Sequence, residues 1–455
     1  MIKFTAINPA TGEQGKSHEG VSFEQARDAA KKAAGAQKEW KESPFSERAS
    51  LMSKAAAVLR RRKKKLAEIA AVEMGKPVAQ GMGEVEKCAL VCEYYAENAE
   101  KFLADEQIKT DSGKVYTKYQ PLGVVLAVMP WNFPFWQVFR FAAPGLMAGN
   151  AGLLKHSSNV PGCSVAIQEV FDEAGFPENV FTSLPIDSES ASKLIDVDEV
   201  SAVTVTGSTE AGAKIAERAG RNIKKCVLEL GGSDPFIVLD DADVKQCAKF
   251  AVQGRTVNSG QSCIAAKRFI VNEKIRREFE KEFAEHMKSL KVGDPMDEAT
   301  QIGPLARKDI MDALLKQIDG SVKMGAKVLA GGKRKGSKGF FVEPTIVTDV
   351  KPEMPVFAEE TFGPVACVIG FRNEEEAVRL ANMTEYGLGA SIWSKDVAKA
   401  ERIAARIDAG AVFVNKVVAS DPRIPFGGIK KSGYGRELGR LGILEFMNAK
   451  SVVVQ

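Results

Sequence analysis

The sequence predicts an α/β protein built on a doubly wound parallel sheet, with a second α/β region and a small separate sheet. From about residue 120 to 240, apolar strands alternate with amphipathic helices, which is the pattern of βαβ units and a parallel sheet. Strands and helices continue beyond this block to about Val414. The chain ends in the β-branched run 451–454, and we expect residues 439–455 to form the small sheet with the segment 113–119.

The individual elements follow from hydrophobic periodicity and from turn residues. Residues 23–34, 46–74 and 78–103 are predicted helices, and Gly75 and Pro77 end the second of them. In the alternating block the expected strands are 122–129, 152–155, 180–184, 201–206 and 225–230, and the helices between them are 135–148, 163–174, 190–195 and 210–219. Beyond it we expect helix 243–257, strand 268–271 and helix 273–290. Doubly wound sheets bind ligands at the carboxyl ends of their strands.

Length and composition exclude several classes of function. A chain of 455 residues is too long for one hydrophobic core, so two or three domains are expected. The net charge is only +4, which indicates neither nucleic acid nor an acidic membrane surface as a partner. The apolar stretch 122–154 is interrupted by Pro130, Pro134 and Arg140, so it is not expected to span a membrane. With no secretory signal visible and an odd number of cysteines, seven, we expect a cytoplasmic protein without a disulfide framework.

Histidines and the one basic run have ordinary explanations. The three histidines, His18, His156 and His286, lie in no recognisable motif, which argues against a histidine-dependent catalytic triad and against a metal site. No bound metal is therefore expected.

The run 60–65 of arginines and lysines has the composition of a nucleic-acid patch. A solvated helix face explains the run better, because lysine and arginine stems pack along a helix while their charges stay in water.

Four stretches place reactive or ligand-type residues at strand ends, namely 129–134, 206–210, 228–232 and 258–263. Cys263 follows a polar turn, and a helix beginning near it would favour the thiolate, the nucleophilic form. A buried inert thiol is the alternative, and it is what we expect of the other six cysteines. Glu229 ends an apolar run, so burial is expected to raise its pKa toward that of a general base near neutrality. Gly207 and Ser208 end a strand and open a helix, where free N–H groups can hold a pyrophosphate or Ser208 can act as a plain N-cap.

Taken together, the motifs resemble those of the aldehyde dehydrogenase superfamily over essentially the whole chain. The stretches PWNFP, TGSTEAG, LELGG, GQSC, EETFGPV and PFGGIKKSGYGRE occur in the order of the family's signatures. The resemblance implies a Rossmann-like doubly wound cofactor domain formed by residues 1–112 and 122–229. It also implies an α/β catalytic domain at 230–420 and an oligomerisation sheet formed by 113–121 and 439–455. Such proteins form homodimers or homotetramers.

The resemblance also implies roles for individual residues. Cys263 is the nucleophile that attacks the aldehyde carbon, and the Asn132 side-chain amide with the Cys263 backbone N–H forms the oxyanion hole. Glu229 activates the water that hydrolyses the thioester. The implied cofactor contacts are Trp131, Asn132, Lys155, Ser158, Gly207, Ser208, Leu230, Glu360 and Phe362. Gly427, Gly428 and Gly433 are expected to shape the chain that returns over the site.

The cofactor expected is NADP, with NAD possible. Relatives that prefer NAD often carry glutamate where Ser158 stands, and a carboxylate there accepts the ribose 2′-hydroxyl but repels a 2′-phosphate. Ser158 removes that charge, and Lys155 supplies a cation. We expect His156 to pack rather than to bind the cofactor.

Within the family, the chain most resembles the succinate-semialdehyde dehydrogenases. Arg140 and Ser420 stand where those enzymes bind the distal carboxylate of the substrate, and Trp136 is expected to line the tunnel. A salt bridge between Arg140 and a protein carboxylate is the alternative. Some relatives have a further arginine at the position of Val257, and we expect the nearby Arg255 to point elsewhere. Other readings are a broad-specificity aldehyde dehydrogenase, a CoA-acylating enzyme, which Glu229 argues against, and a relative without activity.

Overall fold

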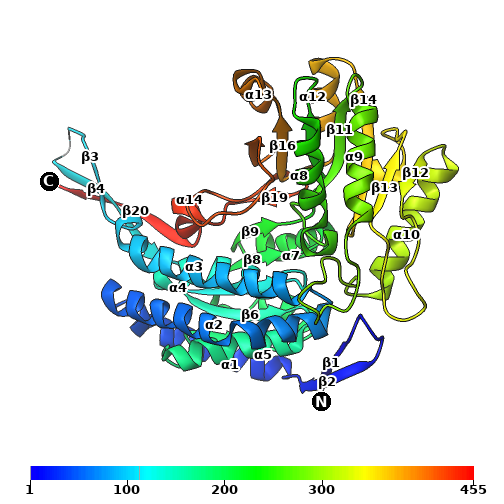
Figure 1. The fold of residues 1–455 in the computed structure, drawn as a ribbon. Helices are drawn as coiled ribbons and strands as arrows, with labels where there is room; N and C mark the ends of the chain where they lie inside the picture. The colour runs from blue at the N-terminus through cyan, green and yellow to red at the C-terminus, as the bar shows by residue number, and fades with distance from the viewer. Residues whose placement is uncertain (1, 112) are drawn as a thin grey trace.

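The computed structural model describes residues 2–111 and 113–455 and shows two lobes, each built around one sheet (Figure 1). A small sheet of three strands projects from one side and carries the C-terminus near its tip (Figure 1). Within the described residues, no helix is both long enough and apolar enough to cross a membrane. The apolar stretch 122–154 forms β5 (Val124–Met129), α4 (Trp136–Met147) and β6 (Ala151–His156).

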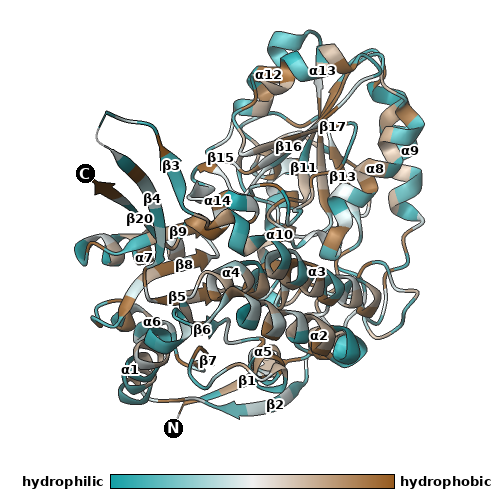
Figure 2. Cartoon of the chain, turned by 90° about the vertical axis from the view of Figure 1, so that its left-hand side faces the viewer, coloured by the Kyte–Doolittle hydropathy of each residue, from teal (hydrophilic) through white to brown (hydrophobic). Residues whose placement is uncertain are grey.

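The first lobe contains a six-stranded sheet in the order β19-β9-β8-β5-β6-β7. Besides β5 and β6, its strands are β7 (Phe181–Ser183), β8 (Val200–Thr206), β9 (Lys225–Glu229) and β19 (Gly433–Tyr434). All neighbours pair in parallel except β19, which is antiparallel to β9. The predicted strands of the alternating block are therefore confirmed. Strands that are buried on both faces are mostly apolar. Figure 2 shows β8 and β9 as largely hydrophobic ribbons inside the lobe, whereas the outer helix α1 (Phe23–Trp40) is mostly hydrophilic.

Helices cover this sheet and were largely predicted. Besides α1 and α4, they are α2 (Phe45–Met74), α3 (Val78–Phe102), α5 (Pro161–Ala174), α6 (Ser188–Leu194) and α7 (Thr209–Arg221). Gly75 ends α2 in the left-handed region at φ 77°, as expected of a C-terminal glycine. α1 runs past its predicted end, residue 34, because the buried Trp40 anchors it by donating a hydrogen bond to the Leu146 carbonyl at 2.9 Å.

The basic run 60–65 lies on α2, and its arginines are paired with acids. Arg60 pairs with Glu86 and Glu93, and Arg62 pairs with Glu169. The run is thus a solvated helix face, as predicted.

The second lobe contains a seven-stranded sheet in the order β12-β13-β14-β11-β10-β16-β17. Its strands are β10 (Asp234–Val238), β11 (Ala266–Asn272), β12 (Lys327–Ala330), β13 (Thr345–Thr348), β14 (Val365–Phe371), β16 (Gly389–Trp393) and β17 (Ala411–Val414). Its helices are α8 (Val244–Thr256), α9 (Arg276–Lys288), α10 (Lys308–Lys323), α11 (Pro355–Ala358), α12 (Glu374–Asn382) and α13 (Val397–Ala404). The central strand β10 was not predicted from the sequence, since Asp234 and Pro235 open it and proline is rare in central strands. The polar N-terminal hairpin of β1 (Lys3–Ile7) and β2 (Gln14–Glu19) was not predicted either.

The projecting sheet consists of β20 (Met447–Val454), β4 (Lys114–Pro121) and β3 (Glu106–Ile108). β20 and β4 are antiparallel, from Met447 opposite Pro121 to Val454 opposite Lys114. This confirms that the end of the predicted segment 439–455 forms a sheet with the region 113–119, but residues 439–444 form a short helix instead. Figure 2 shows that the tip of β20 is hydrophobic. The chain reaches β20 through β18 (Ile429–Lys430), which pairs with β15 (Tyr386–Gly387), and through β19 and α14 (Gly439–Leu444).

Candidate active site

Cys263 lies in a tight loop between the 3₁₀ turn η1 (Val257–Gly260) and β11. Gly260 has φ 78°, and a Cβ there would lie 2.2 Å from the Gly363 carbonyl oxygen, so only glycine fits. The expectation that a helix begins near Cys263 was wrong, because the residues after it enter β11 instead. The helix dipole is therefore not available to stabilise a thiolate.

The electrostatic surroundings of Cys263 include two buried cations. Burial raises the pKa of the thiol to about 12, and the nearby charges of Arg140 and Lys267 oppose this rise. The Lys267 ammonium is fully buried and donates to the carbonyl oxygens of Ser262 at 3.0 Å and Cys263 at 2.6 Å. Lys267 thus fixes the loop that carries the thiol.

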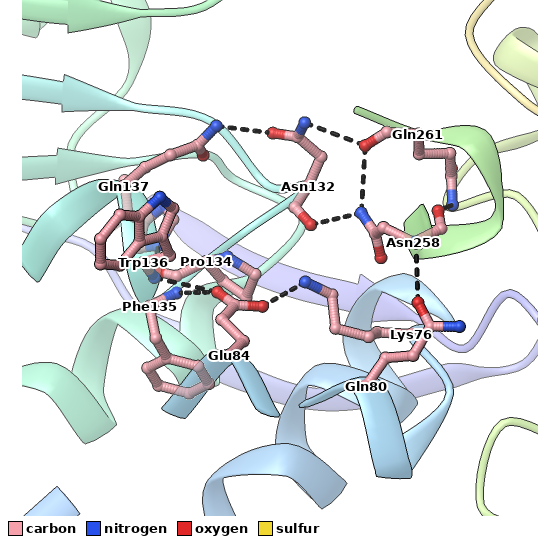
Figure 3. Close-up of polar contacts among 11 residues, drawn as sticks. Lys76, Gln80, Glu84, Asn132, Pro134, Phe135, Trp136, Gln137, Asn258 and Gln261 are labelled. Atoms are coloured by element: carbon pink, nitrogen blue, oxygen red, sulfur yellow. Dashed lines mark hydrogen bonds and ion pairs between the residues drawn. The ribbon is translucent and has the colours of Figure 1, made fainter. Parts of the chain in front are cut away.

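Asn132 is buried beside this loop, and its side-chain amide is held on both sides (Figure 3). Its Nδ2 donates to the Gln261 carbonyl at 3.0 Å, and its Oδ1 accepts from Gln137 Nε2 at 3.1 Å. Asn258 Nδ2 donates to the carbonyl oxygens of Asn132 at 2.6 Å and Gln261 at 3.0 Å (Figure 3). The amide group of Asn132 is therefore oriented toward the Cys263 loop before any ligand binds.

A buried ion pair holds the segment that follows Asn132. Glu84 on α3 accepts from the backbone N–H groups of Phe135 at 2.8 Å and Trp136 at 2.9 Å, at the N-terminus of α4 (Figure 3). Lys76 pairs with the same carboxylate. A carboxylate at a helix N-terminus is favoured by the helix dipole, and the pairing with Lys76 offsets its burial. No sequence signal identified this pair, because Lys76 lies in the loop between two predicted helices and Glu84 looks like an ordinary helix-surface charge.

Glu229 lies at the end of β9 and is 2 % exposed. Neither of its carboxylate oxygens has a hydrogen-bond partner among the described residues. Burial, and after it the nearby Glu437, raise the pKa of Glu229 well above its usual value. The direction is the one predicted from the apolar strand end.

The returning chain packs against Glu229, as expected of the glycines at 427–433. Gly433 pairs with Glu229 in the sheet. A Cβ at Gly427 would lie 2.7 Å from Glu229 Oε1. Only glycines therefore allow the chain to pass this close to the carboxylate.

A cavity of about 890 Å³ reaches Cys263 from the side of α3 and α4. Trp136, Arg140 and Ser420, the three residues expected to bind substrate, all line it. Val257 lines it as well, whereas Arg255 is fully buried and donates to the Gly260 carbonyl at 2.6 Å, so it points elsewhere as expected.

Arg140 is not free within this cavity. It is ion-paired with Glu437, and the two side chains are only 3% and 4% exposed. It also donates to Thr206 Oγ1 at 3.2 Å and lies over the Phe426 ring. Arg140 therefore pairs with a protein carboxylate, which is the alternative considered from the sequence. Glu437 is the last residue of the motif PFGGIKKSGYGRE, but its role as the buried partner of Arg140 was not predicted.

A second cavity of about 250 Å³ reaches Cys263 from the first sheet. Eight predicted site residues line it: Trp131, Asn132, Gly207, Ser208, Leu230, Cys263, Glu360 and Phe362. The Trp131 and Phe362 rings meet edge to face with centroids 5.7 Å apart. Glu360 accepts from the Gly232 N–H at 3.0 Å and pairs with Lys267 at 3.4 Å. Ser208 Oγ also caps α7 by accepting from the Ala211 N–H at 3.3 Å, so the plain N-cap reading holds as well.

The remaining two predicted cofactor residues lie at the end of β6. Ser158 is exposed and lines two further cavities, one of which is also lined by Lys3, Arg307 and Lys308. Lys155 is buried and has no hydrogen-bond or ion-pair partner within residues 2–111 and 113–455. His156 is neutral and structural, since burial lowers its pKa to about 4 and its Nε2 lies 2.8 Å from the Pro134 carbonyl oxygen.

These features fit a dinucleotide lying from Ser158 to Cys263. No acceptor among the described residues holds the Lys155 ammonium, and a phosphate or a ribose hydroxyl would supply one. The position of a Cβ on Gly207 faces open space with no atom within 4 Å, which leaves room for a ligand against the backbone. In the described part of the chain, no cluster of histidine, cysteine and acidic residues suits a metal ion.

Comparison with known proteins finds relatives that are aldehyde dehydrogenases. The model of the aldehyde dehydrogenase family matches residues 2–452. A probable NADP(+) succinate-semialdehyde dehydrogenase of Synechocystis sp. is 51% identical over 454 residues, covering 99% of each chain. The NAD(P)+ succinate semialdehyde dehydrogenase Sad of Escherichia coli is 45% identical and covers 98% of this chain and 97% of its own length. The crystal structure of succinic semialdehyde dehydrogenase from Streptococcus pyogenes with NADP+ has a TM-score of 0.97 at 39% identity, covering 99% of both chains.

Proposed function

The chain belongs to the aldehyde dehydrogenase family, and from this premise we propose that it oxidises succinate semialdehyde to succinate with NADP as the hydride acceptor. One observation carries the proposal. Cys263 lines both the cavity between α3 and α4 and the cavity at the first sheet, so a substrate in the one and a nicotinamide in the other meet at the same sulfur. The relatives described as succinate-semialdehyde dehydrogenases support the choice of substrate.

The first half of the reaction takes place at Cys263. Its sulfur, once deprotonated, forms a bond to the aldehyde carbon, and the carbonyl oxygen becomes an alkoxide. The Asn132 amide and the Cys263 backbone N–H stabilise that charge, because both are fixed before the reaction and need no reorganisation. A bound NADP would supply the hydride acceptor. As the alkoxide reforms the carbonyl, the hydride leaves the same carbon, which is then a thioester of Cys263.

The second half of the reaction is hydrolysis of the thioester. Glu229 takes a proton from water, the resulting hydroxide attacks the thioester carbon, and the Cys263 sulfur leaves. A carboxylate with a raised pKa is a stronger base than an ordinary glutamate, and its buried position keeps it unsolvated until it acts. The products are succinate, the free thiol and one proton.

We propose that the cofactor is held by Trp131, Lys155, Ser158, Gly207, Ser208, Leu230, Glu360 and Phe362. The choice of NADP rests on charge at the adenosine end. Ser158 places no carboxylate there, and the exposed cations Lys3, Arg307 and Lys308 line the adjoining cavity. Arg307 and Lys308 are paired with Asp309 and Asp312, which weakens but does not cancel their pull on a 2′-phosphate. NAD is therefore expected to work less well.

Arg140, Trp136 and Ser420 are proposed to bind the distal end of the substrate. One observation favours a second candidate function, a broad-specificity aldehyde dehydrogenase. Because Glu437 already pairs with Arg140, the guanidinium offers less net charge to a substrate carboxylate than a free arginine would.

We further propose that the chain forms a homodimer or homotetramer through the projecting sheet. β20 lies at the edge of that sheet, and its Val453 and Val454 are 59% and 48% exposed. An exposed apolar edge strand is normally paired or covered.

The proposed function is tested by following NADPH formation with succinate semialdehyde and with butanal, with and without coenzyme A. We expect succinate semialdehyde to give the higher kcat/KM, succinate to be the product, and coenzyme A to have no effect. Cys263→Ala should be inactive while still binding NADP. Equal kcat/KM for the two aldehydes would favour the broad-specificity reading, and formation of succinyl-CoA would overturn the hydrolytic mechanism.

A further inference from the structure

Lys87 is a half-buried cation in the cavity that leads to Cys263, and no residue motif drew attention to it. It lies on α3 one turn after Glu84, on the edge of the helix face that packs against α4. Its neighbours on that face, Glu84, Cys88 and Val91, are buried. An ammonium in this position loses much of its hydration and therefore requires polar or anionic partners.

The partners that the structure provides are neutral. Lys87 Nζ donates to Ser420 Oγ at 2.6 Å and lies 4.2 Å from the centroid of the Trp136 ring. Within residues 2–111 and 113–455, no carboxylate lies within ion-pair distance of Lys87. The nearest acid on its own helix, Glu84, is already paired with Lys76. Two of the three ammonium protons are thus free to bind an anion in the cavity.

Arg140 lies in the same cavity but has a different electrostatic situation. Its guanidinium is ion-paired with the buried Glu437, whereas no carboxylate is paired with Lys87 among the described residues. Coulombic attraction between two charges is several times stronger in a site shielded from water than in bulk solvent. An anion entering this cavity therefore gains more from Lys87 than from Arg140, and the exposed Lys249 and Lys416 at the cavity wall add attraction of the same sign.

We propose that Lys87, together with Ser420, binds the distal carboxylate of the substrate and is the main residue that selects a short aldehyde with a distal carboxylate over a neutral one. The inference rests on the proposed function, because it assigns the recognition of the carboxylate of that same substrate. The aromatic face of Trp136 keeps the ammonium in place and excludes water from the pair.

The first experiment compares Lys87→Met with wild type by the ratio of kcat/KM for succinate semialdehyde to kcat/KM for butanal. A hydrogen-bonded charge pair of this kind is expected to change the ratio roughly ten- to a hundredfold. Lys87→Arg keeps the charge and should recover most of the ratio. Lys101→Met removes a lysine from the exposed last turn of the same helix, outside the cavity, and should leave the ratio unchanged.

The second experiment needs no variant, because burial and the charge of Arg140 lower the pKa of Lys87 to about 8. Among the groups that face Lys87, Asp421 has its pKa lowered to about 2 and burial raises the pKa of Cys88 far above its usual value, so neither changes charge between pH 7 and 9.5. Arginines stay charged, and Glu84 is held in its ion pair with Lys76. The wild-type ratio should therefore be high at pH 7 and fall as pH rises through about 8, whereas in Lys87→Met it should be low and flat.

The outcomes separate the inference from the proposed function. If wild type handles butanal as well as succinate semialdehyde, the proposed function fails. If wild type prefers succinate semialdehyde but Lys87→Met lowers both kcat/KM values by the same factor, or the wild-type ratio is flat with pH, Lys87 is a structural residue and the inference is overturned. Should Lys87→Met fold poorly, the wild-type pH dependence alone decides.

Discussion

The side-chain nitrogen of Asn132 lies 3.0 Å from the carbonyl oxygen of Gln261, two residues before Cys263 in the sequence. This hydrogen bond and the one that Gln137 donates to Asn132 Oδ1 leave one orientation for the amide, with its NH₂ group toward the thiol loop. One N–H is used by Gln261, and the second remains for the oxygen of a substrate. The site is therefore preorganised by side chains of one lobe and a backbone carbonyl of the other.

The first prediction follows from that geometry. Asn132→Ala should lower the rate of the first NADPH burst by about 10²–10³-fold, which is the usual effect of losing one oxyanion-hole donor. Binding of NADP, measured by fluorescence quenching, should change far less. Gln137→Ala should reduce the burst more weakly, because it only loosens the amide. A burst of normal rate in Asn132→Ala would mean that the amide does not contact the reacting oxygen.

The second prediction concerns pH and Glu229. Since its pKa is raised, the carboxyl is protonated at low pH, and the base form increases as pH rises. Steady-state turnover should therefore increase with pH, whereas Glu229→Gln should retain the NADPH burst and lose most of the turnover at every pH. Rapid-mixing measurements of both phases check this. A pH-independent turnover in wild type would show that thioester hydrolysis by Glu229 is not the slow step.

The features of this site that could be predicted are those caused by residues close together in the sequence. The raised pKa of Glu229 was predictable because the apolar residues of β9 that bury it lie next to it in sequence. The second cause of the raised pKa is Glu437, which is distant from Glu229 in the sequence and could not be predicted from the residues around it. The prediction of a helix after Cys263 was wrong because distant contacts decide the structure there. The residues Ile264-Ala265-Ala266 suit a helix locally, but pairing with β10 and β14 makes β11 a strand. Lys87 was missed because nothing in an amphipathic helix distinguishes a lysine that faces a cavity from one that faces water.

The third prediction is a reversal of cofactor preference by Ser158→Glu. Like charges about 4 Å apart repel by about 1 kcal/mol in bulk water and by about 4 kcal/mol near a protein surface. Because Ser158 is exposed, we expect the lower part of this range, a loss of roughly ten- to thirtyfold in kcat/KM for NADP. The value for NAD should change little. Ser289→Glu adds the same charge at an exposed position on α9's C-terminal side and should leave both values unaltered. A wild type that prefers NAD would contradict the prediction at once.

The fourth prediction is that the chain self-associates through β20. In sedimentation at micromolar concentration, wild type should migrate as a dimer or larger species rather than at 49.1 kDa. Val453→Lys places a charge on the exposed edge strand and should shift the population toward monomer. Val397→Lys, at an exposed valine on α13, is the matched control and should not. A wild-type monomer would leave the projecting sheet without its proposed partner.

The last prediction weighs the two roles open to Arg140. Arg140→Leu leaves Glu437 buried without its cation, and breaking such a pair costs about 3–5 kcal/mol, so the variant should unfold at lower denaturant concentration. Glu437→Gln leaves the arginine in place and is the matched test of the pair itself. Loss of the ion pair depresses kcat/KM for succinate semialdehyde and butanal equally, whereas loss of a substrate contact depresses only the former.

We expect Arg140→Leu to lower the ratio of the two kcat/KM values by about tenfold, the lower end for a hydrogen bond to a charged group, because Glu437 shares the guanidinium. Glu437→Gln should then keep or raise the ratio, since it frees Arg140 for the substrate carboxylate. If Arg140→Leu reduces both kcat/KM values by one factor, Arg140 acts through Glu437 alone. Recognition of the carboxylate would then fall to Lys87 and Ser420, whose contact in the cavity does not depend on that ion pair.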